Sequence, residues 1–417
     1  MGLIDFQCVY LDKWGINVSL QRSSDMPSPK RLIYSHIAER GTVSKAELLE
    51  RYSMTSSTLT RLLEEMVSEK LIEASGFGPS SGGRRPILYE TNPHYGYFFG
   101  LEISRFSSTL GFFDVRMNPM SLTRWRMDEA MTPERVVDHA SAMMKSILND
   151  HRIDPSQVVG VGIGAVGPLD RERGIIVKPR YFSSPGWVNV PICRMIEEKT
   201  GFPAELENGA NAALMGEQWA MRSVKPLHML YVHAGVGLRS AMMSYGQIIH
   251  GSLDMEGAIG QMIIQTDGPR LNEDGNFGAL EAFASVQALE RMAQSRVKIS
   301  GGDWAGRLQV PPDRLRYELL LQELRQNNSH VEEMFRQAAS YLGIGLANMI
   351  NMFHPETVVL GGALINSYDR FYDTAIGVAR KNVYYYPEYE PVFTKGELRE
   401  DAVATGAALM MWKKMPV

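Results

Sequence analysis

The sequence has 417 residues, too many for a single hydrophobic core, and predicts two or three domains. With 44% hydrophobic and 22% charged residues and a net charge of −4, it indicates an ordinary globular protein without general attraction for nucleic acid. Apolar runs fall short of the roughly 18 residues that span a bilayer, and the acidic start does not resemble a secretory signal, so we expect a cytoplasmic protein without a membrane partner. The only cysteines, Cys8 and Cys193, exclude a disulfide framework and a cysteine-based zinc cluster.

Residues 28–93 predict a small domain of three short helices and a two-stranded hairpin. The first helix is expected from Pro29 to Arg40, and Ser44 begins the second, because Glu47 follows at the spacing of a capping box. The third helix has apolar residues at a helical spacing that predicts one buried face: Leu59, Leu62, Leu63, Met66 and Val67. Residues 1–27 form an N-terminal extension to which no pattern assigns a role.

The opposite face of the third helix is predicted to carry small hydroxyl groups and one arginine, namely Ser56, Ser57, Thr60 and Arg61. Such side chains reach phosphates and base edges without bulk. The strands Leu71 to Ala74 and Ile87 to Glu90 are joined by GPSSGGRR, where glycines hold Arg84 and Arg85 on an exposed tip. Three helices and a two-stranded wing predict a winged helix-turn-helix that binds a double-stranded DNA operator. The alternative for the hydroxyl-bearing residues is an ordinary solvated surface.

Charge sets a second expectation for this domain. Basic and acidic residues nearly balance in it, so a single copy attracts DNA weakly. The arginines of the tip are placed to reach a phosphate or a narrow minor groove. We therefore expect a homodimer or higher homo-oligomer that doubles the contacts with DNA.

The rest of the chain, residues 94–417, alternates strand-like and helix-like segments, which is typical of an α/β fold. Tyr97 to Ile103 and Ser108 to Asp114 predict a pair of strands, and Val158 to Gly164, VVGVGIG, predicts a buried strand. Val331 to Ile350 has the periodicity of a long amphipathic helix and precedes another buried strand, VVLGGAL.

Several motifs in this part resemble, in order and spacing, those of the ROK family of repressors, open reading frames and sugar kinases. They are VGVGIGAVGP, the PGW turn, ENGAN, EGAIGQM, YLGIGLANMINMFHPETVVLGG and DAVATGAALM, and GGRRP resembles the branch of xylose and N-acetylglucosamine repressors. The resemblance covers residue 28 onward and implies an α/β protein with an N-terminal winged helix-turn-helix and a two-lobed actin-like (ribonuclease H-like) ATPase fold. It implies lobe 1 at residues 94–212 plus 400–417 and lobe 2 at 213–399.

The groups that kinases of this family use on ATP and on the sugar are replaced here. The first phosphate loop, DxGGT in the kinases, reads Glu102, Ile103, Ser104 and Arg105, so side chains occupy the space that glycines leave for phosphates. The catalytic base is the Asp of ENDAN, and Gly209 stands at that position. The comparison implies a protein without kinase activity and without a cofactor. Glu102 is left either as an orphan charge or as a partner of Arg105.

The family's zinc site is also changed. It uses a His in an EIGHM-like motif and three downstream cysteines, whereas Gln261 replaces the His and Leu271 to Glu281 contains no cysteine. A structural zinc site needs such thiolate or imidazole ligands, so no metal is expected. Without the metal, Asp267 to Asn276 is expected to be a mobile or reorganised loop.

Part of the family's sugar pocket is retained. Asn208 and Glu281 stand at sugar-contacting positions, and with Gly167, Gln261 and Asn189 they are the candidates for binding a hydroxyl-rich effector. The resemblance thus implies a repressor of carbohydrate-utilisation genes, gated by a sugar or sugar derivative that changes the angle between the lobes. Two alternatives stay open: a constitutive DNA-binding or interaction module with a vestigial pocket, and an active sugar kinase.

Overall fold

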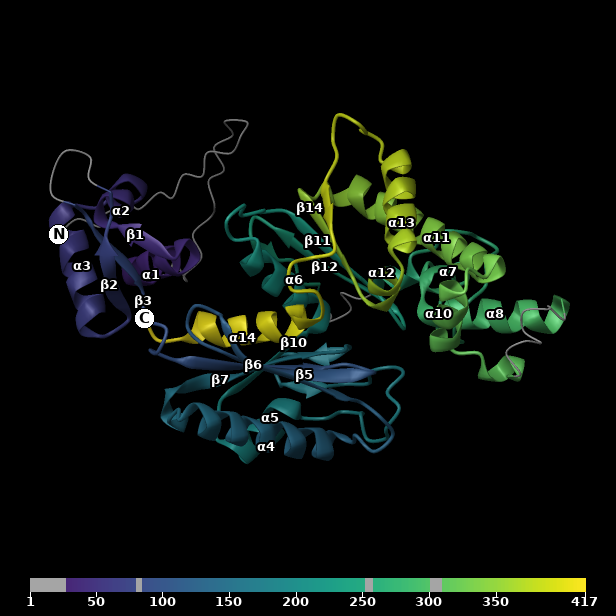
Figure 1. Cartoon of the computed structure of the whole chain (residues 1–417), viewed down its shortest axis with the longest axis horizontal. Coiled ribbons are helices and arrows are strands. Elements are labelled where there is room, and N and C mark those ends of the chain that lie inside the picture. The colour runs from purple at the N-terminus through teal and green to yellow at the C-terminus, as the bar shows by residue number, and fades with distance from the viewer. Residues whose placement is uncertain (1–27, 80–84, 252–257, 301–309) are drawn as a thin grey trace. The chain divides into compact units, whose positions relative to one another are not determined.

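The computed structural model describes the following residues: 28–79, 85–251, 258–300 and 310–417 (Figure 1). The chain divides into two compact units, one that ends at Thr91 and one from Asn92 to Pro416. The predicted extension, residues 1–27, and the predicted tip residue Arg84 lie outside the described residues. Within the described ranges, no helix is both long and apolar enough to cross a membrane.

The first unit contains three helices and a small antiparallel sheet. The helices are α1 (Pro29–Arg40), α2 (Lys45–Arg51) and α3 (Ser56–Ser68), and the strands are β1 (Thr42–Ser44), β2 (Ile72–Phe77) and β3 (Ile87–Thr91). The strand order is β1-β3-β2. The three predicted helices and the hairpin are therefore present. The sequence does not predict β1, because three residues are too few to show an alternating pattern.

The buried face of α3 is narrower than its sequence pattern predicts. Leu59, Leu63 and Met66 are buried, whereas Val67 is 42% exposed. At about 100° per residue, Val67 lies roughly 80° around the helix axis from Leu59, at the edge of the apolar stripe. Burial of Val67 is thus a wrong prediction, and the core of this unit rests on the central residues of the stripe.

Polar contacts fix the ends of these helices and join two of them. The predicted capping box is confirmed, since the Glu47 backbone N–H donates to Ser44 Oγ at 3.3 Å and the Ser44 N–H donates to Glu47 Oε2 at 3.0 Å. Lys30 Nζ of α1 contacts Glu65 at 3.0 Å and Glu69 at 2.5 Å, both on the C-terminal half of α3. These contacts hold α1 against α3 and neutralise two acidic side chains of α3.

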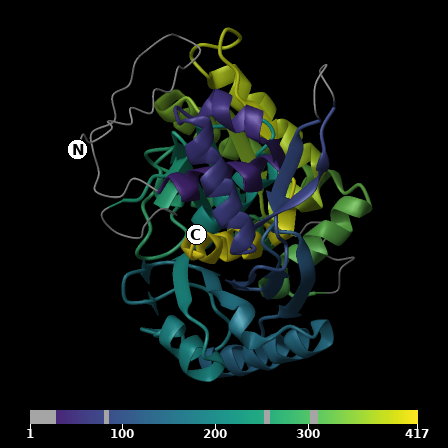
Figure 2. The same ribbon diagram turned by 90° about the vertical axis from the view of Figure 1, so that its left-hand side faces the viewer.

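The first sheet of the second unit has the order β10-β7-β4-β5-β6. Its strands are β4 (Tyr97–Ile103), β5 (Ser107–Phe113), β6 (Pro119–Arg126), β7 (Val158–Ala165) and β10 (Ala204–Asn208). The strands β4, β5 and β6 are antiparallel neighbours, whereas β7 runs parallel to β4 and to β10. The helices α4 (Pro133–His151) and α5 (Ile192–Thr200) cover one face of this sheet (Figures 1 and 2). Between β7 and α5 lie two short strands, β8 (Leu169–Asp170) and β9 (Ile175–Ile176).

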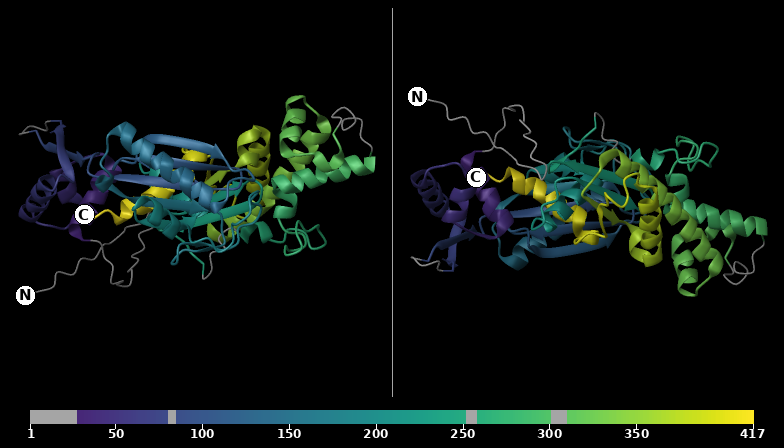
Figure 3. Two further views of the ribbon diagram at one scale, coloured as in Figure 1. Left: turned by 90° about the horizontal axis from the view of Figure 1, so that it is seen from below. Right: turned by 90° about the horizontal axis from the view of Figure 1, so that it is seen from above.

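The second sheet has the order β13-β12-β11-β14-β15. Its strands are β11 (Met229–Ala234), β12 (Leu238–Ser244), β13 (Gln247–Ile248), β14 (Thr357–Gly361) and β15 (Val392–Thr394). One face is covered by a large apolar cluster from α8 (Val286–Ser300), α10 (Tyr317–Arg325), α11 (Ser329–Phe353) and α13 (Asp369–Asn382). Figure 3 shows α8 and α10 extending beyond this sheet. The shorter helical segments are η1 (Pro155–Gln157), η2 (Ala258–Gln261), α7 (Glu281–Ala284), η3 (Pro312–Arg314), α12 (Ala363–Ser367) and η4 (Arg399–Asp401).

Two helices lie between the sheets and join them. The C-terminal helix α14 (Ala402–Lys414) packs on β4 and β7 of the first sheet, on the face opposite α4 (Figure 1). The helix α6 (Gly209–Ala220) packs on β11 and β12 of the second sheet and against α14. The helix α14, which lies late in the sequence, therefore packs against β4, the first strand of this unit.

Close main-chain contacts fix the position of α14 between the first sheet and α6. A Cβ atom added at Gly100 of β4 would lie 1.9 Å from the carbonyl oxygen of Ala404, and one at Gly162 of β7 would lie 1.8 Å from that of Ala407. On the other side, a Cβ at Gly406 would lie 1.6 Å from the carbonyl oxygen of Ala212 in α6. No side chain fits at these positions, because each obstacle is main chain and cannot rotate away.

The seating of α14 is open to a direct test. We expect Gly162→Ala to lower the free energy of unfolding by roughly 2 to 4 kcal/mol, since the added methyl group forces α14 away from the sheet. The matched control is Gly377→Ala, inside α13, where an added Cβ meets no atom within 4 Å. That change should raise stability by up to about 1 kcal/mol through helix propensity. Urea unfolding measures both, and equal effects would contradict the assignment.

Candidate functional site

A cavity of about 700 Å³ in the second unit is lined by residues near the ends of strands from both sheets. Arg105 follows β4, Gly167 follows β7, Asn208 ends β10, and Arg239 begins β12. Carboxyl ends of neighbouring parallel strands meet at one edge of a sheet, which is where ligands bind in open α/β folds. Four of the predicted effector-site residues line this cavity together, namely Gly167, Asn208, Gln261 and Glu281. Asn189 is not among the lining residues; it is exposed, and its backbone N–H donates to the Val177 carbonyl at 2.7 Å.

Asn208 is held rigidly at the start of α6. Its Oδ1 accepts from the Ala210 backbone N–H at 2.9 Å, which caps the helix, and this leaves the Nδ2 amide group for a ligand. The preceding Glu207 is buried and accepts from the Asn208 N–H at 2.7 Å through Oε1. Its Oε2 contacts Arg171 at 3.3 Å and Nε2 of His250, which follows β13, at 3.1 Å. Glu207 therefore links the two lobes beside the cavity.

Gln261 replaces a metal ligand with a set of hydrogen bonds. Its Nε2 donates to Glu281 Oε2 at 3.2 Å, and its Oε1 accepts from the Asn276 backbone N–H at 2.9 Å. The Asn276 side chain in turn donates to the Gln261 carbonyl at 3.0 Å. Two hydrogen bonds thus join Gln261 to Asn276, in the loop that the sequence predicts to be mobile or reorganised. In the described part of the chain, no group of His, Cys, Asp and Glu side chains could hold a metal ion.

The guanidinium group of Arg239 lies beside Gly209. A Cβ atom at Gly209 would lie 3.6 Å from Arg239 Nη1, so the guanidinium group adjoins the position that lacks a side chain. The Nε atom of Arg239 is buried and has no hydrogen-bond partner among the described residues. Burial, together with Arg239 and Arg105, lowers the pKa of His233 to about 3, so this histidine is neutral at physiological pH. His233, Gly209 and Arg239 line a small adjoining pocket, and Arg239 also lines the larger cavity together with Arg105.

Glu102 and Arg105 do not pair with each other, although the sequence leaves that possibility open. Thr109 Oγ1 donates to Glu102 Oε2 at 3.1 Å, and Arg124 Nε donates to Thr109 Oγ1 at 3.1 Å. Arg105 Nε instead donates to the Arg180 carbonyl at 2.8 Å, and its guanidinium lies over the Tyr181 ring, 5.6 Å from the centroid. Burial raises the pKa of Glu102 to about 7, although Thr109 and the nearby arginines oppose this shift.

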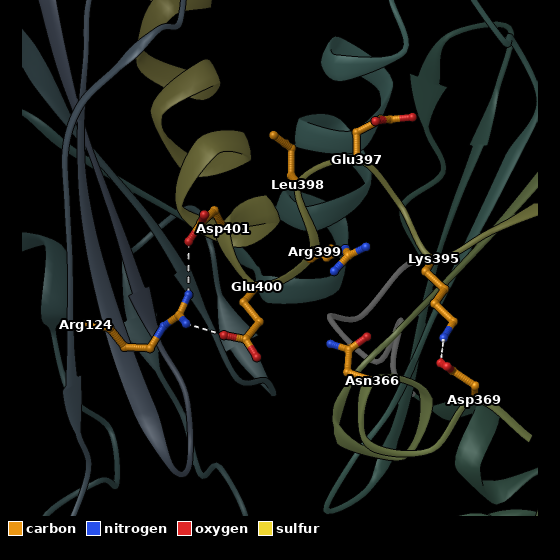
Figure 4. Close-up of a pocket in the computed structure, with 9 residues that line it drawn as sticks. All are labelled: Arg124, Asn366, Asp369, Lys395, Glu397, Leu398, Arg399, Glu400 and Asp401. Atoms are coloured by element: carbon orange, nitrogen blue, oxygen red, sulfur yellow. Dashed lines mark hydrogen bonds and ion pairs between the residues drawn. The ribbon is translucent and has the colours of Figure 1, made fainter. Parts of the chain in front are cut away.

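A second cavity, of about 770 Å³, lies beside Arg124, and the sequence does not predict it (Figure 4). Its lining comes from β6, the region of α12 and α13, and residues 395–401, which are far apart in the chain. Arg124 forms ion pairs with Glu400 and, at 3.0 Å, with Asp401, while Lys395 pairs with Asp369 at 2.6 Å. The charges of this cavity are largely neutralised by one another. Arg124 also connects it to Glu102 through Thr109.

In the first unit, the predicted DNA-contacting residues have different environments. Ser56, Ser57 and Arg61 of α3 are exposed, and so is Arg85, just before β3. Thr60 is half-buried: its Oγ1 donates to the Ser56 carbonyl at 2.8 Å and accepts from Lys45 Nζ at 2.6 Å. The Thr60 hydroxyl is thus engaged within the unit, whereas the arginine side chains face solvent.

Comparisons with known proteins agree on one family. The model of the ROK family matches residues 120–414. A putative xylose repressor from Caldicellulosiruptor sp. (strain Rt8B.4) is 26% identical over 395 residues, which cover 93% of this chain and 96% of the relative. A glucokinase from Thermotoga maritima is 28% identical over 267 residues, 63% of this chain and 82% of that enzyme. The fold matches a crystal structure of a ROK family transcriptional regulator, a homologue of the Escherichia coli MLC protein, with a TM-score of 0.71 and 19% identity over 92% of this chain and 97% of that one.

The environment of Glu102 predicts a pH effect on stability. Its pKa rises on folding from 4.5 to about 7, so the folded protein holds the proton more tightly than the unfolded chain. The resulting stabilisation is complete below pH 4.5 and is lost as the pH rises through 7, by up to roughly 3 kcal/mol. Glu102→Gln should therefore gain stability over the wild type between pH 5 and pH 8, as measured by urea unfolding.

The control is Glu129→Gln, which removes an exposed carboxylate before α4 and should show no such trend. A difference between Glu102→Gln and the wild type that stays constant from pH 5 to pH 8 would show that Glu102 is already ionised in the folded protein.

Proposed function

The chain belongs to the ROK family, and on this premise we propose that it is a transcriptional repressor of carbohydrate-utilisation genes, gated by a sugar or sugar derivative, without kinase activity. This proposal rests on the share of this chain that each relative matches. The repressor relative matches 93% of this chain, which must include most of the unit ending at Thr91, whereas the glucokinase relative matches 63%. The additional unit is the feature that a DNA-binding protein requires and a sugar kinase does not.

The first unit supports DNA binding by its architecture and by its exposed arginines. Three helices followed by an antiparallel hairpin have the arrangement of a winged helix-turn-helix, in which the third helix enters the major groove. We assign contacts with DNA to Ser56, Ser57 and Arg61 on α3 and to Arg84 and Arg85 on the wing. Thr60 is assigned a positioning role, because its hydroxyl holds Lys45 and the backbone of α3.

The cavity in the second unit supports ligand binding without phosphoryl transfer. Removal of a proton from a sugar hydroxyl requires a general base within hydrogen-bond reach. Gly209 offers none, and the nearby guanidinium of Arg239 disfavours proton acceptance by any group placed there. An open cavity of about 700 Å³ with Asn208, Gln261 and Glu281 along its wall is suited to a hydroxyl-rich effector.

In this proposal the repressor acts as a homodimer or higher homo-oligomer. Two DNA-binding units must match operator half-sites about one helical turn apart, or a multiple of it. An effector that changes the angle between the lobes would alter that match and thereby the affinity for DNA. A constitutive DNA-binding module remains the alternative, and it differs in showing no response to a ligand.

DNA binding is tested by fluorescence anisotropy of the full chain on DNA from its own upstream promoter. We expect tight, salt-sensitive binding, and we expect Arg61→Ala and Arg85→Ala each to weaken it about tenfold or more. Each lost phosphate contact should reduce the slope of log affinity against log salt by about 0.9. A panel of sugars and sugar derivatives added to the bound complex tests the gating.

The control is Arg40→Ala, which removes an equally exposed arginine at the C-terminal end of α1 and should leave affinity within about twofold. Binding that no metabolite alters would favour the constitutive module. Absence of binding to any promoter fragment would contradict the repressor assignment.

Kinase activity is tested by ADP release with ATP and glucose, xylose or N-acetylglucosamine. We expect no turnover above background for the wild type, because the base is missing at Gly209. We also expect none for Gly209→Asp, since the new carboxylate would lie within ion-pair reach of Arg239. Sugar-dependent turnover by the wild type at the 1 to 100 per second that is typical of kinases would overturn this part of the proposal.

A further inference from the structure

The charges that line the cavity of the second unit are unbalanced. Among the described residues that line it, four are basic and two are acidic: Arg105, Lys178, Arg180 and Arg239 against Asp274 and Glu281. The second cavity shows the opposite arrangement, with Arg124 and Lys395 bound to carboxylates of its own lining (Figure 4). Of the two cavities, the first therefore keeps an excess of positive charge.

The basic side chains of this cavity form few hydrogen bonds or ion pairs with the other described residues. Lys178 is exposed and forms no hydrogen bond or ion pair with the described residues, and Arg180 has only a 3.4 Å contact with Asp274 at the exposed rim. Arg105 uses Nε on the Arg180 carbonyl, which leaves the rest of its guanidinium toward the cavity. Arg239 has a buried Nε without a partner among the described residues. Several N–H donors thus remain available to one ligand.

The two inner arginines also repel each other. Burial and the charge of Arg239 lower the pKa of Arg105 to about 9. The charged form of each guanidinium is therefore destabilised by the other. Glu102 lies near Arg239, but burial raises its pKa to about 7 and weakens its compensation near neutral pH. Glu281 partly offsets the charge of Arg105, and its two oxygens also accept from the Leu238 N–H and from Gln261. An anion in the cavity would relieve this repulsion.

The remaining wall suits a sugar. The Asn208 amide and Gln261 face the same cavity as the four basic groups, with Pro168 and Leu238 as apolar surface. We propose that the cavity binds an anionic carbohydrate, a sugar bearing a phosphate or a carboxylate, whose charged group is held by Arg105, Lys178, Arg180 and Arg239. This inference rests on the proposed function, since it specifies the chemical class of the effector.

The test is isothermal titration of the full chain with matched sets of ligands. Each set contains a neutral sugar, its phosphate ester and its sugar acid, for glucose, xylose and N-acetylglucosamine, with inorganic phosphate alone as a further arm. We expect at least one phosphate ester or sugar acid to bind ten times or more tightly than its neutral parent, and the preference should shrink as salt is added. The two derivatives distinguish a phosphate from a carboxylate.

Variants locate the anionic group. Lys178→Gln with Arg180→Gln removes two exposed charges without disturbing the core, and it should abolish most of the preference for the anionic ligand while changing affinity for the neutral parent less than about threefold. Arg173→Gln is the control, since this arginine lies on the same lobe, is exposed, and does not line the cavity. It should leave both affinities unchanged.

Three results would overturn the inference: neutral sugars that bind as tightly as their anionic derivatives, inorganic phosphate that binds as tightly as the phosphate ester, or no binding by any member of the sets. The same protein samples are tested on promoter DNA by anisotropy. Tight DNA binding without an anionic preference would leave the proposed function standing, whereas an anionic preference without DNA binding would contradict the repressor and keep the ligand assignment.

Discussion

The second unit depends on one constraint: the main chain of α14 packs in close contact with the first sheet. Gly100, Gly162 and Gly406 bring backbone within distances that exclude any Cβ atom. The helix α14 also packs on α6, whose N-cap residue Asn208 lines the cavity. The segment before α14 carries Glu400 and Asp401 to Arg124. One helix at the end of the chain thus positions residues of both cavities.

The two cavities differ more in the charge of their linings than in shape. Around Arg124 the ion pairs are internal, and a ligand would have to replace partners that are already well placed. In the first cavity, Arg239 and Arg105 lie near each other, and the position that would carry a base is a glycine. Such a site stabilises negative charge, in keeping with the anionic ligand proposed for it.

The amide group of Gln261 connects two segments that line the cavity. An amide side chain has both a donor and an acceptor, so it bonds Glu281 on one side and the backbone of Asn276 on the other. Two hydrogen bonds with Asn276 join Gln261 to the loop whose residues Asn272 and Asp274 line the cavity.

Local patterns in the sequence determined the helices of the first unit, the capping box at Ser44, the buried strand β7 and the absence of side-chain chemistry at Gly209, because each depends on residues close together in the chain. The order of motifs determined the family. Tertiary structure alone decided that Arg239 adjoins Gly209, that Glu102 bonds Thr109 rather than Arg105, and that Asn189 is not among the residues that line the cavity. Burial, electrostatic neighbours and the lining of a cavity are set by segments distant in sequence, and no local pattern encodes them.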